Sequence, residues 1–96
     1  MAVFIEDSII LEIKNGNKSS FQGLYEMLIS PLYSFAGKFL NDTLLLEDIV
    51  QESFVSYWGN RDDFDNIATV KSFLYTSVRN ACLNYLKHQK VEQKHE

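Results

Sequence analysis

Apolar residues recur every three or four positions through most of this 96-residue chain, and no stretch sustains an alternation of apolar and polar residues. The first pattern is typical of helices that bury one face, whereas alternation would indicate half-buried strands. A chain of this length buries about 60 to 65% of the surface that it exposes when unfolded, which is enough for one modest core. We therefore expect an all-α fold, a compact bundle of about four helices.

Turn and capping residues set the limits of the first two expected helices. The first covers about 5–14 and ends at the turn Asn15-Gly16-Asn17, whose residues tolerate positive φ. Ser19 or Ser20 is expected to cap the second helix. The apolar positions of these two helices recur at helical spacing: Ile9, Ile10 and Ile13, then Phe21, Leu24, Tyr25, Leu28, Leu32, Phe35, Ala36 and Phe39.

Two more helices are expected after Asn41-Asp42-Thr43, which supplies both a stop and the next N-cap. They cover about 43–59 and about 69–88. The segment RDDFDNIAT between them is rich in Asp and Asn, so we expect an ordered loop there. The apolar stripes of these two helices are Leu46, Ile49, Val50, Phe54, Tyr57 and Trp58, then Val70, Leu74, Ser77, Val78, Ala81 and Tyr85.

The composition is that of a folded protein, with 46% hydrophobic, 14% aromatic and 23% charged residues. No apolar run approaches the roughly 18 to 20 residues that span a bilayer. The start, MAVFIEDSII, lacks the basic leader and cleavage site of a signal peptide. We therefore expect a cytoplasmic protein, and the single Cys82, which cannot form an internal disulfide, agrees with a reducing compartment.

The net charge of −4 hides two regions of opposite sign. Residues 1–65 carry four basic and eleven acidic groups, a net charge of −7, whereas residues 66–96 carry five basic and two acidic groups, a net charge of +3. Nucleic-acid-binding domains usually carry a basic face, so the overall charge argues against such a partner but the distribution does not. The two regions predict two different surfaces.

Asp48, Gln51 and Glu52 form a polar patch on the third expected helix, on the side away from its apolar stripe. One interpretation is a solvated face, helped by the attraction of first-turn carboxylates to the positive end of the helix, which does not reach Gln51 or Glu52. The other is a docking surface for a basic partner, in which charge steers the encounter.

A mildly basic face follows on the fourth expected helix. It consists of Arg79, Asn80 and Lys87 together with Ser72 and Thr76, and Lys71 and Asn84 lie at its two margins. Lys and Arg near a helix C-terminus are favoured by its dipole, which would explain part of this face. Alternatively it is a nucleic-acid surface, where Lys and Arg hold phosphates and Asn contacts base edges.

Phe64, isolated in the loop, either stacks on an unpaired base or closes the end of the bundle. The loop carboxylates Asp62, Asp63 and Asp65 count against close approach of phosphate. We find no metal-ligand spacing, no phosphate-binding glycine loop and no nucleophile with a suitable base, so we expect neither an enzyme nor a cofactor or metal site.

Three segments in this order, LYEMLISPLYSFAGKFL, EDIVQESFVSYW and SFLYTSVRNACLNYLK, resemble region 2 of a bacterial RNA polymerase sigma factor of the extracytoplasmic-function (ECF) class. The resemblance covers about residues 8–88. It implies a transcription initiation module whose Asp48, Gln51 and Glu52 dock on the clamp helices of the polymerase beta-prime subunit. Most members of the class are held inactive by an anti-sigma factor, so such a partner is implied as well.

The resemblance also implies that the loop and last helix recognise the promoter minus-ten element on the melted non-template strand. One base would be flipped into a pocket formed by the loop and the start of that helix. Phe64 and the adjoining loop match that pocket, with Asn80 and Asn84 lining the site. Lys71, Arg79 and Lys87 match positions near backbone phosphates. This sequence departs from many members at Phe73, where they have Trp, and at Thr76, where they have Arg, so its DNA face is less basic than theirs.

Members of the class carry a second helical domain that reads the minus-thirty-five element, which these 96 residues do not contain. We expect a region 2 domain over 1–88, followed in 89–96 by a polar tail that frays or begins the linker to such a domain in a longer protein. Two other interpretations stay open. One is a sigma-like decoy that binds an anti-sigma regulator without directing transcription, and the other is a generic helical adaptor.

Overall fold

The computed structural model describes residues 7–94, with side chains to residue 89, and every regular element in that range is helical. The elements are α1 (Asp7–Lys14), α2 (Lys18–Ala36), α3 (Thr43–Gly59), a 3-10 turn η1 (Arg61–Asp63) and α4 (Ile67–Lys94). This confirms the predicted all-α fold. Residues 5–6 of the first expected helix and 95–96 of the expected tail lie outside the described residues.

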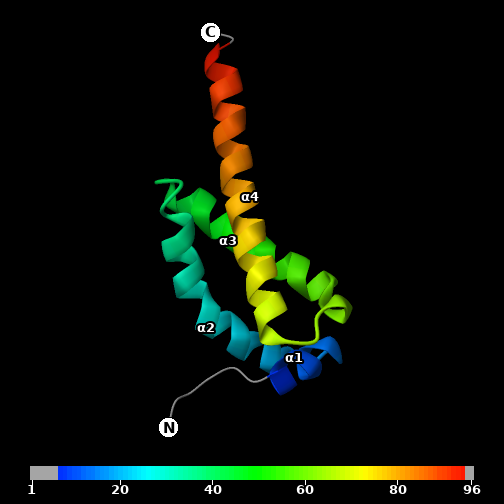
Figure 1. Ribbon diagram of the computed structural model, residues 1–96. Helices are drawn as coiled ribbons and strands as arrows, with labels where there is room; N and C mark the ends of the chain where they lie inside the picture. The colour runs from blue at the N-terminus through cyan, green and yellow to red at the C-terminus, as the bar shows by residue number, and fades with distance from the viewer. Residues whose placement is uncertain (1–6, 95–96) are drawn as a thin grey trace.

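Helix α3 crosses α4, while α1 and the start of α2 lie at the end of the bundle where α4 begins (Figure 1). The C-terminal part of α4 extends beyond the other helices (Figure 1). None of the helices in residues 7–94 combines the length and the hydropathy that a membrane span requires.

One hydrophobic core joins the four helices, and most of its residues belong to the predicted stripes. Ser53 is also buried. The core tolerates its hydroxyl because the hydroxyl donates a hydrogen bond to the Val50 carbonyl at 2.6 Å. The buried positions follow helical spacing in each element: Ile10 and Ile13 of α1, Leu24, Leu28, Leu32 and Ala36 of α2, Ile49, Val50, Phe54 and Tyr57 of α3, and Val70, Leu74, Val78 and Cys82 of α4.

The cap of α2 differs from the prediction. Asn17, rather than Ser19 or Ser20, has the extended backbone of an N-cap, and its side-chain oxygen accepts a hydrogen bond from the Ser20 amide at 3.0 Å. Ser20 lies inside the helix and donates its hydroxyl to Glu12 at 2.7 Å. Helix α3 begins as predicted, because Asp42 accepts from the Leu45 amide at 3.1 Å.

Helix α4 is longer than predicted, since it covers Ile67–Lys94 rather than 69–88. It begins earlier because Asn66 accepts a hydrogen bond from the Thr69 amide at 2.9 Å and so acts as its N-cap. Beyond residue 88 the sequence contains no Gly or Pro to stop a helix, and Gln89 donates to the Tyr85 hydroxyl one turn back at 2.9 Å. The prediction that the chain frays from residue 89 is therefore wrong for the residues up to Lys94, which are helical. The limit of the domain at residue 88 stays a prediction.

Candidate functional site

The polar patch of α3, which we call the acidic ridge, consists of Asp48, Gln51 and Glu52, and all three side chains are exposed. The opposite face of the same helix buries Val50, Phe54 and other core residues. Helix α3 therefore has two distinct faces, one packed against the core of the domain and one exposed to solvent. The bundle brings the three ridge residues together as their spacing predicted.

The acidic ridge separates two surface grooves. Gln51 lines a groove of about 600 Å³ between α2 and α3, whose other residues are mostly aromatic, among them Phe21, Tyr25 and Trp58. Asp48 and Glu52 line a second groove of about 400 Å³ between α3 and α4. A partner that binds across the ridge would thus contact carboxylates on one side and aromatic rings on the other.

Tyr33 of α2 lies close to the same ridge. Burial raises the pKa of its hydroxyl above the ordinary value, the nearby Glu47 carboxylate raises it further, and the Gln51 side chain acts in the opposite direction. The hydroxyl therefore stays protonated at neutral pH and offers a donor beside Gln51.

Two ridge neighbours were not foreseen from the sequence. Leu44 and Val55 are 78% and 61% exposed, although both are large apolar residues. At 100° per residue they share the face of Asp48, at the two ends of the acidic ridge. The signal was present in the sequence as an outward stripe at 44, 48, 51 and 55, which also has helical spacing.

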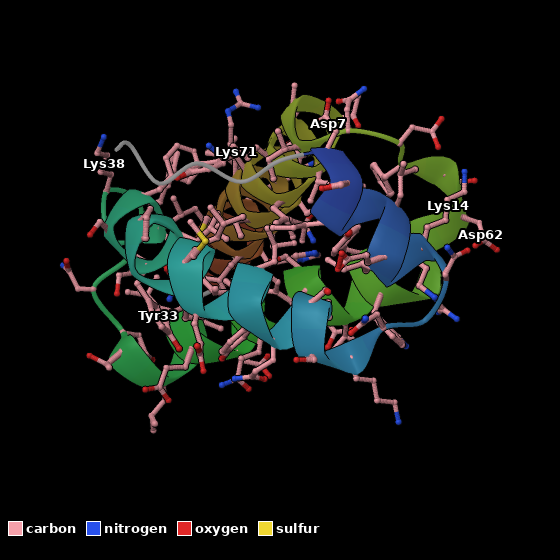
Figure 2. The ribbon with its side chains drawn as sticks, turned by 90° about the horizontal axis from the view of Figure 1, so that it is seen from below. Asp7, Lys14, Tyr33, Lys38, Asp62 and Lys71 are labelled. Atoms are coloured by element: carbon pink, nitrogen blue, oxygen red, sulfur yellow. The ribbon has the colours of Figure 1, made fainter. Side chains whose placement is uncertain are left out.

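The basic face of α4 is exposed at every predicted position: Lys71, Arg79, Asn80, Asn84 and Lys87. Helix α4 carries no Asp or Glu between Ile67 and Gln89, so no carboxylate of its own offsets these charges there. Lys71 lies one turn into the helix (Figure 2). The described face thus has the charge and the amide groups that single-stranded nucleic acid would contact.

The residues of this face are spread along α4 rather than gathered at the loop. With a rise of 1.5 Å per residue, Asn80 lies roughly 20 Å and Lys87 roughly 30 Å along the axis from Ile67. Phe64 precedes Ile67, so it cannot share one small pocket with Asn80 and Asn84. A partner that contacted all of these residues would have to extend along the axis of α4.

Phe64 packs into the end of the bundle. It is half-buried, and its ring contacts those of Tyr57 and Phe73 edge-on, with centroids 5.4 and 5.1 Å away. Of the two interpretations given to this residue, the packing favours closure of the bundle end over a free stacking platform. The neighbouring carboxylates Asp62, Asp63 and Asp65 are exposed around it.

No group of three or more His, Cys, Asp or Glu side chains within the described part of the chain is arranged to hold a metal ion. Cys82 is buried in the core, and its burial raises the pKa of the thiol. A buried, protonated thiol is a packing residue rather than a nucleophile.

Comparison with known families identifies the fold. The model of the family described as Sigma-70 region 2 matches residues 24–91, most of α2 and α4 and all of α3. The chain belongs to the Sigma-70 region 2 family. The matched range contains the acidic ridge and the basic face of α4.

Individual sigma factors agree with this assignment. The chain is 30% identical over 69 residues to the ECF RNA polymerase sigma factor SigM of Bacillus subtilis, which covers 72% of this chain and 42% of SigM. It is 25% identical over 83 residues to SigW of the same organism, which covers 86% of this chain and 44% of SigW. The chain thus spans less than half the length of these sigma factors. The resemblance to region 2 of the ECF class is confirmed.

A solved structure shares the fold of this sigma region 2 domain. An NMR structure of an engineered region 2 of sigmaE, in complex with GTAAAA, superposes with a TM-score of 0.72 at 22% identity and covers 94% of this chain and 95% of the other. At this identity the likeness establishes the helical arrangement alone.

Proposed function

We propose that this domain is the part of an ECF sigma factor that binds core RNA polymerase through the acidic ridge and recognises the melted minus-ten element through the α3–α4 loop (residues 60–66) and α4. The observation that supports this most is the exposure of two faces of opposite charge, on α3 and α4, in a chain of the Sigma-70 region 2 family. The module acts by binding and carries out no chemistry of its own.

The acidic ridge suits a helical, basic partner such as the clamp helices of the beta-prime subunit. Asp48 and Glu52 supply charge that steers the encounter, and Gln51 supplies a hydrogen-bonding amide. Leu44 and Val55 add exposed apolar area at the two ends of the ridge. A polar centre with apolar flanks gives both orientation and buried area to such an interface.

The DNA-binding part of the proposal depends on α4. Lys71, Arg79 and Lys87 would hold phosphates, while Asn80 and Asn84 would read base edges. Affinity from this domain alone is expected to be weak, because three lysine or arginine contacts give a small electrostatic contribution and the loop carries three carboxylates. A region 4 domain after a linker, beginning in 89–96, would supply the rest of the promoter contact.

The Glu52→Lys substitution tests the polymerase surface. Binding to a recombinant beta-prime clamp-helix fragment should weaken at least tenfold, since a carboxylate is replaced by a charge that repels the basic partner. Glu12→Lys is the matched control, because it makes the same charge change at an exposed position of α1 and should leave the affinity nearly unchanged. Equal losses for both variants would show a general charge effect and contradict the assignment of the ridge.

A second candidate, a sigma-like decoy that binds an anti-sigma regulator, is favoured by one feature. The α4 face offers few cations beside an acidic loop, which suits weak DNA binding. A decoy would fail to bind the clamp-helix fragment, and Glu52→Lys would then change nothing. An anti-sigma partner is compatible with both proposals, so its binding alone does not distinguish them.

A further inference from the structure

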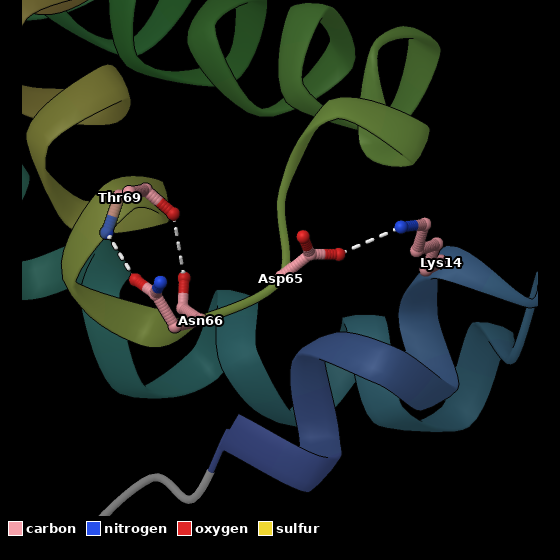
Figure 3. Close-up of polar contacts among 4 residues, drawn as sticks. All are labelled: Lys14, Asp65, Asn66 and Thr69. Carbon is pink, nitrogen blue, oxygen red and sulfur yellow. Dashed lines mark hydrogen bonds and ion pairs between the residues drawn. The ribbon is translucent and has the colours of Figure 1, made fainter.

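Two side chains of α1 reach the segment that joins α3 to α4. Asp7 accepts a hydrogen bond from the backbone amide of Ile67 at 2.9 Å, and Lys14 forms an ion pair with Asp65 at 2.7 Å (Figure 3 for the ion pair). The partners are 60 and 51 positions apart in the sequence. We call these two contacts the α1 clasp.

Asp7 caps α4 from outside the helix. Ile67 is the first residue of α4, so its N–H has no partner within the helix. The local cap, Asn66, accepts from the Thr69 amide, and the Asn66 carbonyl accepts from the Thr69 hydroxyl, both at 2.9 Å (Figure 3). Asp7 therefore satisfies a donor that Asn66 leaves open, and its carboxylate is favoured by the positive end of the helix.

Lys14 faces the carboxylates of the loop. Its hydrogen bond with Asp65 raises the pKa of its ammonium group most, and Asp62 and Asp63 raise it further. Figure 2 shows Lys14 and Asp62 next to each other at one edge of the molecule. Lys14 thus partly offsets the negative charge that surrounds Phe64.

We propose that the α1 clasp holds the α3–α4 loop and the first turn of α4 in the conformation that receives the promoter strand. Asp7 and Lys14 are positioning residues that do not themselves contact DNA. The inference rests on the proposed function of the loop and α4. Its physical basis is preorganisation: a loop that is already held loses less conformational entropy when it binds.

The location of these contacts makes the effect local. The side chains of Lys14 and Asp65 are 33% and 71% exposed, and exposed ion pairs contribute little to global stability. The core residues of α1, Ile10 and Ile13, are fully buried and take no part in either contact, so they should continue to anchor the helix when the clasp is removed. Loss of the clasp should therefore loosen the loop without unfolding the domain.

The test uses the single-stranded hexamer that the unchanged domain selects from a randomised DNA pool. Asp7→Ala and Asp65→Asn should each weaken binding of this hexamer by up to about fivefold, because the strand must then order a loop that the cap or the ion pair otherwise holds. Both variants remove a negative charge, so electrostatics alone would make them bind DNA more tightly. Loss of the clasp therefore predicts weaker hexamer binding by these variants, whereas the change in charge alone predicts tighter binding.

Conservative variants and a second ligand separate positioning from folding. Asp7→Asn keeps an acceptor oxygen and Lys14→Arg keeps the charge, so both should bind the hexamer nearly as the unchanged domain does, whereas Lys14→Met should not. Binding of the clamp-helix fragment should stay constant in all five variants. Hydrogen exchange of the Ile67 amide should accelerate in Asp7→Ala and much less in Asp7→Asn.

Unchanged or tighter hexamer binding by Asp7→Ala and Asp65→Asn would overturn the inference while leaving the proposed function intact. Parallel loss of hexamer and clamp-helix binding would also overturn it, because it would show general destabilisation. A domain that selects no hexamer would overturn the proposed DNA recognition, and this inference with it.

Discussion

The ring of Phe64 meets the ring of Tyr57 nearly at a right angle, with an interplanar angle of 76° and centroids 5.4 Å apart. Phe64 belongs to the loop and Tyr57 to the core of α3, so this contact ties the expected DNA-binding loop to the interior of the bundle. A base that stacks on Phe64 must use the part of the ring that remains exposed, or displace it from Tyr57 and Phe73.

Phe64→Ala is expected to lower the free energy of unfolding by about 1 to 3 kcal/mol, less than a fully buried phenylalanine because the ring is half-buried. Urea denaturation followed by circular dichroism measures this. Val55→Ala, at a 61% exposed apolar position, serves as the control and should change stability by less than about 0.5 kcal/mol. A Phe64→Ala domain as stable as the original would show that the ring does not contribute to the core.

Tyr57→Phe is expected to raise the stability of the domain. The Tyr57 side chain is fully buried, and its hydroxyl has no hydrogen-bond partner among the described residues. An unsatisfied buried hydroxyl costs about 1 to 3 kcal/mol, so its removal should add about 1 kcal/mol to the free energy of unfolding. A loss of stability in urea denaturation would instead reveal a partner for the hydroxyl.

The same residue predicts a response to alkaline pH. Burial raises the pKa of Tyr57 to about 12, whereas the unfolded chain ionises near the ordinary value of 10. Between about pH 10 and pH 12 the unfolded state therefore holds fewer protons than the folded state. The free energy of unfolding should therefore fall by up to about 1.4 kcal/mol per pH unit in this window. Below about pH 10 the contribution of Tyr57 no longer depends on pH.

The Tyr57→Phe variant isolates this contribution, because it removes the titrating hydroxyl but keeps the ring. Other groups with a raised pKa, such as Tyr33, also lower stability as the pH rises. They are present in both the unchanged domain and the variant, so they do not affect the comparison. Urea denaturation at pH 9, 10 and 11 should give a shallower decline for the variant. Parallel declines would show that Tyr57 ionises in the folded protein at its ordinary pKa.

Local patterns predicted α3 well. Asp42 caps its start and Asn60 its end, and both are residue types that favour helix ends. The helical period of 3.6 residues separated the acidic ridge from the buried stripe. The same period missed Leu44 and Val55, because apolar residues are assigned to the core by default and their exposure depends on which face the other helices leave open.

Contacts between distant segments could not be predicted. The Asp7 cap on Ile67 and the Lys14–Asp65 pair join α1 to the loop across more than half of the chain. Tertiary packing also decided the position of Phe64, since Tyr57 and Phe73 provide a site for the ring that local composition does not reveal. The sequence therefore predicted which residues lie exposed on the acidic ridge and on the α4 face, but not how the loop is held.

Asn80 and Arg79 are adjacent, exposed residues of α4 with different predicted roles, and they form a matched pair. Asn80→Ala should reduce discrimination among minus-ten hexamers by about 1 to 3 kcal/mol at one base position, because an amide can pair with a base edge. Arg79→Ala should weaken binding of all hexamers alike and lower the dependence of log Kd on log salt concentration by about 0.7, the value for one phosphate contact with a single strand.

Lys18→Ala is the control for this pair, since it removes one positive charge from the exposed start of α2 rather than from α4. It should alter neither the salt dependence nor the preferred hexamer. Fluorescence anisotropy against a panel of single-base variants, at several salt concentrations, measures both quantities. If Asn80→Ala lowered the affinity for every hexamer equally, Asn80 would be a backbone contact, and base reading would have to come from Asn84 or the loop.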